Sequence, residues 1–162
     1  MGTSAVILTQ KSKYSPEKLL ADTVVSVFHA DATLYFHNNK YCSEEGEFLY
    51  TTLNINNSSF SEKSEQSIIF SVHGINSPSI DFYYHEDLEL DSDLSLYQVG
   101  HIEDIYGVQK LIFNFIYEYL KLNPDEYFWV TDFDWVYSWE DMQKLKALPY
   151  DPDWCYKNPN TK

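Results

Sequence analysis

The chain has 162 residues, of which 44% are hydrophobic and 17% aromatic, and it carries 25 acidic residues against 11 lysines and no arginine, a net charge of −14. This length and apolar content predict a single domain over residues 1–162, with an irregular tail from about residue 150, and exclude a largely disordered chain. The charge argues against direct nucleic-acid binding, which depends on Lys and Arg contacts to phosphates, and makes a basic protein the natural partner.

The first part of the chain predicts a strand, a helix and a second strand. Residues Ala5–Gln10 form a short apolar run that is typical of a strand. Ser15 is a good N-cap and Pro16 is favourable at the first helical position, so we expect a helix that begins here and fades near Val27. A strand over Thr33–His37 is expected to follow.

The middle of the chain predicts an antiparallel sheet. Three segments of strand length are rich in β-branched and aromatic residues, and connectors rich in Ser, Asn, Gly or Pro separate them. These segments are Glu47–Ile55, Ser67–Gly74 and Ser79–Asp87.

The last part of the chain predicts the longest helix. Apolar residues recur at helical spacing over Ile102–Leu122, with Glu103 and Asp104 in the expected first turn. A strand over Glu126–Phe133 and a helix over Ser138–Leu148, which begins with a capping serine, are expected to follow. The sequence therefore predicts an α+β fold, in which a mainly antiparallel sheet is packed against a long C-terminal-half helix, with a short N-terminal helix and a second C-terminal helix.

The chain shows no signal for export or for membrane insertion. It has no basic start followed by a long apolar stretch, and no apolar run approaches the ~18 residues of a membrane span. Cys42 and Cys155 are far apart and lack the spacing of metal or redox motifs. We therefore expect reduced thiols, a cytoplasmic location and no membrane association.

The densest acidic run is HEDLELDSD, residues His85–Asp93, and it lies in the third of the chain, residues 41–100, that carries −10 of the net charge. Acidic residues alternate from Asp87 onward as the early ligands of a calcium loop do. Counting from Asp87, however, positions six and twelve are Ser92 and Gln98, where an EF-hand needs Gly and a bidentate Glu. The spacing therefore argues against calcium and leaves two interpretations, a solvated acidic edge or a docking surface for a basic protein.

A second acidic cluster lies in FWVTDFDWV, residues 128–136, which resembles the first motif of the haloacid dehalogenase-like phosphatases and the metal-binding DxD of nucleotide-sugar glycosyltransferases. The first resemblance implies that Asp132 is a nucleophile and Asp134 an acid. Only 28 residues follow Asp134, too few to complete the phosphatase site, and no Gly-rich phosphate loop precedes the motif. We therefore interpret the two residues as an acidic pair at the end of a strand, near the surface.

No other pattern predicts catalysis or a cofactor. The five histidines show no HxxxH or HExxH spacing. The chain has no GxSxG elbow, and Cys42 has no recognisable nucleophile context. The sequence therefore predicts a protein that is not an enzyme and needs no metal or cofactor.

Aromatic residues are abundant and lie close to acidic ones. The chain has 14 Tyr, 10 Phe and 4 Trp, and Tyr and Trp are the residues that anchor protein interfaces while carboxylates attract a basic partner. The sequence therefore predicts a non-catalytic binding protein. The residues predicted to contact the partner are Tyr84, Glu86, Asp87, Glu89, Asp91, Asp93, Asp132, Asp134, Trp135 and Trp139.

In general character the chain is similar to the small acidic immunity proteins that bacteria pair with secreted nuclease toxins. This similarity implies capture of a basic toxin domain and inhibition by occlusion of its active site. Two alternatives stay open: a metal-dependent hydrolase or transferase that uses the acidic clusters, and an acidic nucleic-acid mimic that inhibits a DNA-binding enzyme. The sequence leaves the oligomeric state open.

Overall fold

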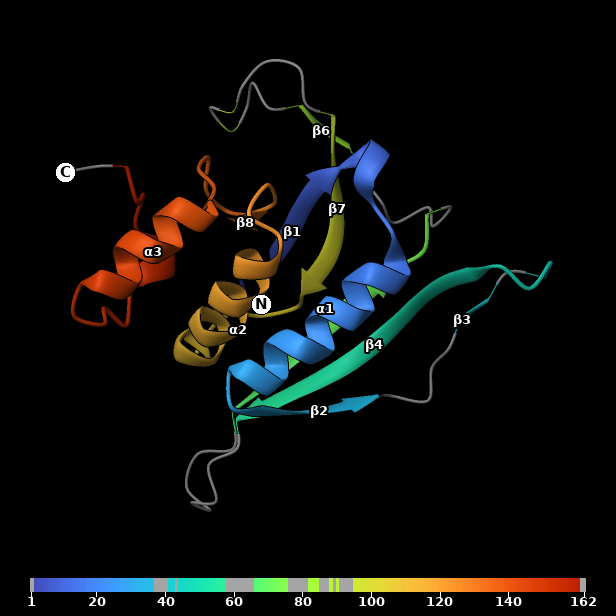
Figure 1. Ribbon diagram of the computed structural model, residues 1–162, viewed down its shortest axis with the longest axis horizontal. Coiled ribbons are helices and arrows are strands. Elements are labelled where there is room, and N and C mark those ends of the chain that lie inside the picture. The colour runs from blue at the N-terminus through green and yellow to red at the C-terminus, as the bar shows by residue number, and fades with distance from the viewer. Residues whose placement is uncertain are drawn as a thin grey trace.

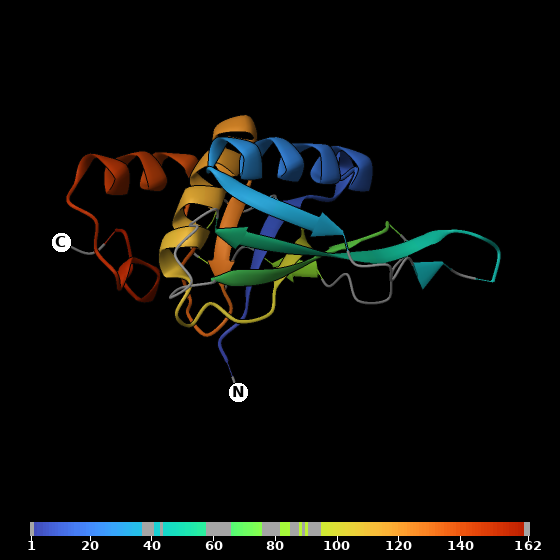
Figure 2. The same cartoon turned by 90° about the horizontal axis from the view of Figure 1, so that it is seen from below.

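The protein folds as an antiparallel sheet with two helices on one face, and the predicted α+β class is confirmed. The computed structural model describes residues 2–36, 41–42, 44–57, 66–75, 82–84, 88, 90 and 95–160. Helices α1 and α2 lie side by side over the sheet, and α3 lies beyond α2 at one end (Figures 1 and 2).

The sheet contains eight strands in the described part of the chain. They are β1 Ala5–Gln10, β2 Ala32–Phe36, β3 Tyr41–Cys42, β4 Phe48–Asn57, β5 Ser67–His73, β6 Phe82–Tyr84, β7 Ser95–Ile102 and β8 Tyr127–Val130. The helices are α1 Pro16–His29, α2 Gln109–Leu122 and α3 Trp139–Ala147, with short 3₁₀ turns at Lys11–Lys13 and Trp154–Tyr156.

The strands follow the order β2-β4-β5-β7-β1-β8, with β3 paired to β4 and β6 paired to β7, and every pairing is antiparallel. One edge of β7 pairs with β1, and the other edge pairs with β6 near its start and with β5 near its end. Because β7 and β8 both pair with β1, these two strands run in the same direction and finish at the same end of the sheet.

The main core lies between the sheet and the helices. Alternate residues of β5, Ile68, Phe70 and Val72, are fully buried beneath them. Phe70 fills the space over Gly100 of β7, where a Cβ atom would lie 2.5 Å from its ring. Only glycine therefore fits at this crossing. Seven residues of α2 complete the core: Leu111, Ile112, Phe113, Phe115, Ile116, Tyr119 and Leu120.

A second, smaller apolar cluster lies on the opposite face of the sheet. Val6, Leu8, Leu96 and Trp129 contribute its strand residues. Leu88, from the acidic run between β6 and β7, is 3% exposed and packs into this cluster, and Leu90 packs against it. The run is therefore attached to the sheet through its leucines.

Both predicted helix caps are present. Ser15 Oγ accepts a hydrogen bond from the backbone N–H of Lys18 at the start of α1. At the start of α3, Ser138 Oγ accepts from the N–H of Asp141 at 3.2 Å, and Asp141 Oδ2 accepts from the N–H of Ser138 at 3.0 Å. This reciprocal pair is a capping box formed with Asp.

Removing the α3 cap is expected to destabilise the fold. Ser138→Ala leaves the N–H of Asp141 without its acceptor, and we expect the free energy of unfolding to fall by about 1 kcal/mol. Urea unfolding followed by circular dichroism measures this change. Ser138→Thr keeps the hydroxyl and should stay within experimental error of the wild type. Equal stability of the alanine and threonine variants would contradict this role for the cap.

The prediction that one helix spans Ile102–Leu122 is wrong at its first turns. Ile102 is the last residue of β7, a strand that the sequence did not predict, and α2 begins at Gln109. Gly107, with φ of +78°, lies in the intervening turn. α1 and α2 therefore both contain 14 residues. The sequence predicted a short N-terminal helix and a long helix in the C-terminal half, and this difference in length is absent.

The irregular tail packs into the core. Apart from one 3₁₀ turn, residues 150–160 form no regular element, as predicted. Trp154 is nevertheless only 2% exposed, and Cys155, a free thiol, is fully buried. The Trp154 ring lies 5.2 Å from that of Phe113, and its Nε1–H donates to the carbonyl oxygen of Gln109 at 3.0 Å. The tail therefore belongs to the same packed unit as α2.

Candidate partner-binding site

Four exposed carboxylates lie on the two segments that leave β7 and β8 at the same end of the sheet. Ile102 of β7 and Val130 of β8 both pair with Ala5, the first residue of β1, so the segments that leave these two strands start on either side of it. Both segments carry acidic residues that are exposed to solvent. We name this surface the acidic end and define it by Glu103, Asp104, Asp132 and Asp134.

The residues before β1 join the two halves of the acidic end. Thr3 Oγ donates a hydrogen bond to Asp132 Oδ2 at 2.8 Å, and the carbonyl oxygen of Thr3 accepts from the N–H of Ile105 at 2.9 Å. Asp104 packs so closely on Gly2 that a Cβ atom there would lie 2.1 Å from its carboxyl carbon. Its Oδ1 also accepts from the N–H of Tyr106 at 3.0 Å. One carboxylate on each side is therefore positioned by the same short segment.

Asp132 and Asp134 lie at the tip of a hairpin that β8 forms with the chain before α3. Phe128 and Tyr137 pair across it with two backbone hydrogen bonds of 2.8 and 2.9 Å. The indole Nε1–H of Trp129 donates to the carbonyl oxygen of Phe133 at 2.7 Å. This hydrogen bond holds the backbone at the tip of the hairpin in place. Both carboxylates consequently project from a defined backbone.

Aromatic rings support the same hairpin. The rings of Phe133 and Trp135 stack with centroids 4.4 Å apart and an angle of 13°. The Trp135 Nε1–H donates to the hydroxyl of Tyr137 at 3.1 Å. That hydroxyl oxygen also lies 2.6 Å from the carbonyl oxygen of Lys157 and 2.9 Å from that of Trp154. The C-terminal tail therefore braces the hairpin that carries the acidic pair.

Two leucines of the acidic run lie against this hairpin as well. Leu88 belongs to the same apolar cluster as Val136, two residues beyond Asp134, and Leu90 packs against that cluster. The five predicted acidic residues of the run, Glu86, Asp87, Glu89, Asp91 and Asp93, lie outside the described residues. Tyr84 is the last residue of β6 and pairs with Ser95. The structure therefore places the two leucines, but not the acidic residues, beside the hairpin.

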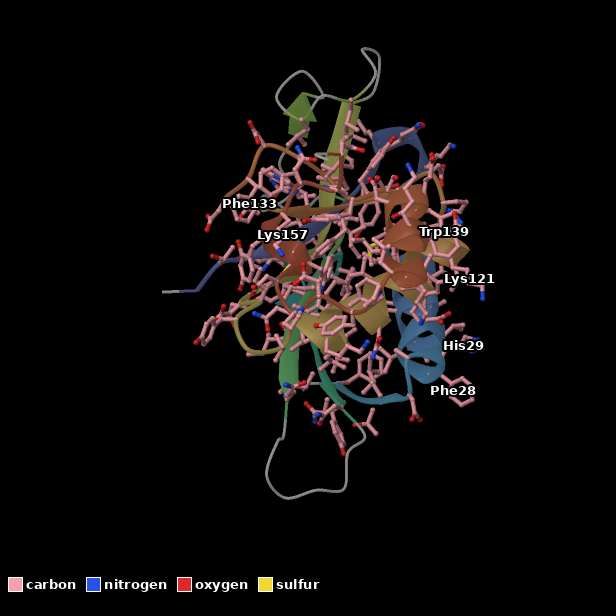
Figure 3. The ribbon with its side chains drawn as sticks, turned by 90° about the vertical axis from the view of Figure 1, so that its left-hand side faces the viewer. Phe28, His29, Lys121, Phe133, Trp139 and Lys157 are labelled. Atoms are coloured by element: carbon pink, nitrogen blue, oxygen red, sulfur yellow. The ribbon has the colours of Figure 1, made fainter. Side chains whose placement is uncertain are left out.

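Trp139, predicted as an anchor beside Trp135, lies elsewhere. Its ring packs on that of Tyr117 in α2, with centroids 4.9 Å apart. The Lys146 ammonium group lies over the same Tyr117 ring, 4.7 Å from its centroid. Figure 3 shows Phe133 and Trp139 on opposite sides of the molecule. As the first residue of α3, Trp139 points toward the helical layer, so it does not share the surface of Phe133 and Trp135.

The most perturbed carboxylate is at the opposite end of β8. Glu126 lies directly before this strand, and the hydroxyl of Tyr119 donates to its Oε1 at 2.8 Å. Burial raises the pKa of Glu126 to about 7. The nearby Lys18 is bound to Asp22 and to Asn123, each at 2.5 Å, and the enclosed space beside these groups measures only about 10 Å³. This volume holds one water molecule and no larger ligand, which makes the cluster structural.

Burial shifts the pKa values of one thiol and two imidazoles in the described part of the chain. Burial raises the pKa of the Cys155 thiol to about 12 and lowers the pKa values of His73 and His101. Cys155 is therefore a poor nucleophile at neutral pH. Within the residues that the structure describes, no three His, Cys, Asp or Glu side chains are grouped so that they could hold a metal ion.

Sequence reasoning found half of the acidic end and missed the other half. Asp132 and Asp134 were predicted because they follow an apolar strand. Glu103 and Asp104 were assigned to the first turn of a helix, although they follow β7 in the same way. The signal that separates the two interpretations is Gly107, because a glycine in the second turn of an expected helix favours a break.

Comparisons with protein-family models, with curated proteins and with solved structures find no match to this chain. None of the helices in the described ranges has the length and apolar character needed to cross a membrane. The arguments for function therefore rest on the geometry of the acidic end and on the chemistry of its residues.

Proposed function

We propose that this chain is a non-catalytic protein that captures a basic protein partner through the acidic end and the adjoining acidic run. The partner class that best fits is a bacterial toxin domain such as a nuclease, so that the chain acts as an immunity protein in the cytoplasm. The observation that carries the proposal is that two strands finish at the same end of the sheet and each is followed by two exposed carboxylates, with a stacked aromatic pair on the hairpin that carries Asp132 and Asp134.

The geometry favours binding because its parts are held in place before any partner arrives. Asp132 is oriented by Thr3, and the hairpin tip is fixed by Trp129. Preorganised groups lose little conformational entropy on association, which strengthens binding. An aromatic pair beside carboxylates also matches the usual division of an interface, in which large rings anchor and charges steer.

Inhibition would follow from occupation of the partner's active site. A nuclease holds its substrate in a cleft lined by Lys and Arg, since phosphate contacts supply much of the affinity. Carboxylates that enter such a cleft occupy the positions of the phosphates. Charge attraction of this kind can raise the association rate constant to ~10⁸–10⁹ M⁻¹s⁻¹ at low salt, and the rate should fall steeply as salt is added.

Charge reversal at the hairpin tests the proposal. We expect Asp132→Lys/Asp134→Lys to slow association with a basic toxin domain that the wild type binds by at least about tenfold and to weaken affinity by about 2 kcal/mol or more. Stopped-flow kinetics and calorimetry measure the two effects, and growth during co-expression reports protection. Reversal of Asp87, Glu89 and Asp91 should weaken binding in the same way.

The matched control is Glu44→Lys/Glu45→Lys, which changes net charge by the same amount at two exposed positions before β4. It should leave the association rate within about twofold of the wild type, because unpaired surface charges far from an interface are screened. All variants should keep the wild-type melting temperature. If the control and the hairpin variant affect binding equally, or neither affects it, the acidic end is not the binding surface.

A further inference from the structure

A cavity of about 260 Å³ lies where the base of the hairpin meets the start of α3, beside two leucines of the acidic run. Leu88, Leu90 and Val136 form its apolar wall, and Tyr127 and Trp135 form its aromatic wall. Phe133 covers one face of the Trp135 ring, so this ring is held in position at the cavity. The cavity is thus lined by three aliphatic side chains and two aromatic rings, one of which is held by stacking.

Polar and charged residues from the start of α3 also line the cavity. Glu140 and Asp141 both line it, together with Ser138 and Lys144. Asp141 is only 8% exposed, and its Oδ2 already accepts hydrogen bonds from the N–H and the hydroxyl of Ser138. Glu140 is different, because its side chain is 77% exposed and its one ion-pair partner in the described residues is Lys144, at 3.2 Å.

We propose that this cavity receives a single arginine side chain of the basic partner, with its guanidinium group on Glu140 and its aliphatic stem along the leucines. The inference rests on the proposed function, since it names the group by which the partner is gripped. A lining that combines leucine side chains with the exposed carboxylate of Glu140 matches a side chain that buries a methylene stem and keeps its charge at the surface.

Arginine fits this cavity better than lysine. A guanidinium group is planar and weakly hydrated, stacks on aromatic rings and binds a carboxylate with two parallel hydrogen bonds. Trp135 and Tyr127 provide rings, and Glu140 provides the carboxylate. The existing Lys144–Glu140 pair is exposed on both sides, and such pairs contribute little, so a guanidinium can replace it.

The cavity and the acidic end would then have separate tasks. Asp132 and Asp134 are exposed and would attract the partner over distance, whereas the aliphatic stem of an arginine in the cavity would be largely removed from solvent. Arginine is among the residues that dominate interface energies when it fills such a pocket. The cavity would therefore govern the dissociation rate, and the acidic end the association rate.

The inference can be tested on the intact chain with N-acetyl-arginine amide as the probe, followed by nuclear magnetic resonance. We expect saturable shifts of the Trp135 indole N–H and of the methyl groups of Leu88, Leu90 and Val136. The corresponding lysine amide should bind more weakly, and the neutral citrulline amide should cause no saturable shift. Glu140→Gln should weaken probe binding about tenfold, because it removes the charged acceptor.

Two further variants should change the affinity for the arginine probe in opposite directions. Lys144→Gln should strengthen probe binding about two- to fivefold, since it removes a competing cation and frees Glu140. Trp135→Leu should weaken it about two- to fivefold by removing a ring. Circular dichroism shows whether each variant remains folded, and Glu140→Gln tests the inference independently, because Glu140 is exposed and supports no core contact. Probe binding that is unaffected by Glu140→Gln, or citrulline binding equal to arginine, would overturn the inference.

The same variants separate this inference from the proposed function. If the hairpin charge reversal abolishes binding of the toxin while Glu140→Gln and Trp135→Leu leave its dissociation rate unchanged, the arginine site is refuted and the binding function stands. If the hairpin reversal has no effect on the toxin while the arginine probe still occupies the cavity, the guanidinium site stands and the proposed function fails.

Discussion

Replacing Glu126 by Gln is expected to stabilise the protein at alkaline pH and to remove a pH dependence that the wild type shows. Glutamine keeps an oxygen that accepts the hydrogen bond from Tyr119, and it carries no charge into the buried space. At pH 9 we expect the variant to exceed the wild type in free energy of unfolding by about 3 kcal/mol, since each unit of pKa shift corresponds to about 1.4 kcal/mol.

The sign follows from the direction of the shift. The pKa of Glu126 is raised from 4.5 to about 7 by burial, so the folded protein binds the proton more tightly than the unfolded chain does. The stability that this protonated carboxyl contributes is fully present below about pH 4.5 and is lost as the pH rises through about 7. The difference between Glu126→Gln and the wild type should therefore be small at pH 4.5 and should grow until about pH 8.

The neighbouring carboxylate supplies a matched control. Asp125 is half exposed and pairs with Lys13 at 2.8 Å, and this hydrogen bond lowers its pKa. Asp125→Asn should therefore have a small effect of the opposite sign, with stability lost above the pH at which the carboxylate ionises. Urea unfolding of the three proteins at pH 4.5, 7 and 9 measures these changes. If the free energies of unfolding of Glu126→Gln and the wild type differ by the same amount at all three pH values, the pKa of Glu126 is not raised by burial.

Replacing Trp154 by Ala should destabilise the fold by about 3–5 kcal/mol, a range typical of removing a buried aromatic side chain. Three rings contact it, those of Phe113, Phe128 and Tyr137, with centroids 5.2 to 5.9 Å away. The substitution also removes the indole N–H that donates to the carbonyl oxygen of Gln109. Both the apolar contacts and one hydrogen bond are lost, and the neighbouring rings can fill the resulting cavity only in part.

Leu148→Ala is the control for this change, because Leu148 comes from the same C-terminal region and is 62% exposed. Its effect should stay within about 0.5 kcal/mol. Guanidinium unfolding gives both values, and near-ultraviolet circular dichroism reports the packing of Trp135 and Tyr137 in the braced hairpin. A Trp154→Ala variant as stable as Leu148→Ala would show that the tail does not belong to the cooperative unit.

Local patterns were sufficient to predict most elements of this fold. β1, β4 and β5 are apolar or alternating segments of strand length, and they lie within two residues of their predicted bounds. α1 and α3 begin at strong N-caps, which is why their starts were predicted correctly. In each case the decisive interactions are between residues close together in the chain, and such interactions are visible in the sequence.

β7 was missed because its end and the following turn imitate a helix. Ile105 and Val108 are buried, and their spacing from Ile112 is helical, yet both lie outside α2. They are buried by packing of the turn rather than by a helical face. Spacing alone cannot separate these two causes, and the partners that make β7 a strand, β1 and β5, lie far away in the chain.

The acidic end illustrates the same limit for a site. The pair Asp132 and Asp134 could be predicted from a local pattern, but only the strand order brings Glu103 and Asp104 to the same end of the sheet. Trp139 shows the converse, because nearness in the chain to Trp135 does not place it on the same surface. A site assembled by a sheet therefore requires the topology, and the sequence supplies only its separate parts.

The alternation of buried leucine and charged residue between β6 and β7 separates two kinds of evolutionary change. Leu88 and Leu90 attach the segment to the sheet through an apolar cluster that includes Trp129 and Val136. Mutations at the acidic positions leave both leucines in the sequence, so they can alter which partner fits while these apolar contacts are kept. Insertion or deletion of one residue between the leucines would instead change the spacing on which both contacts depend. Diverged versions of this chain should consequently vary in charge here and keep both the spacing and the apolar character of the two leucine positions.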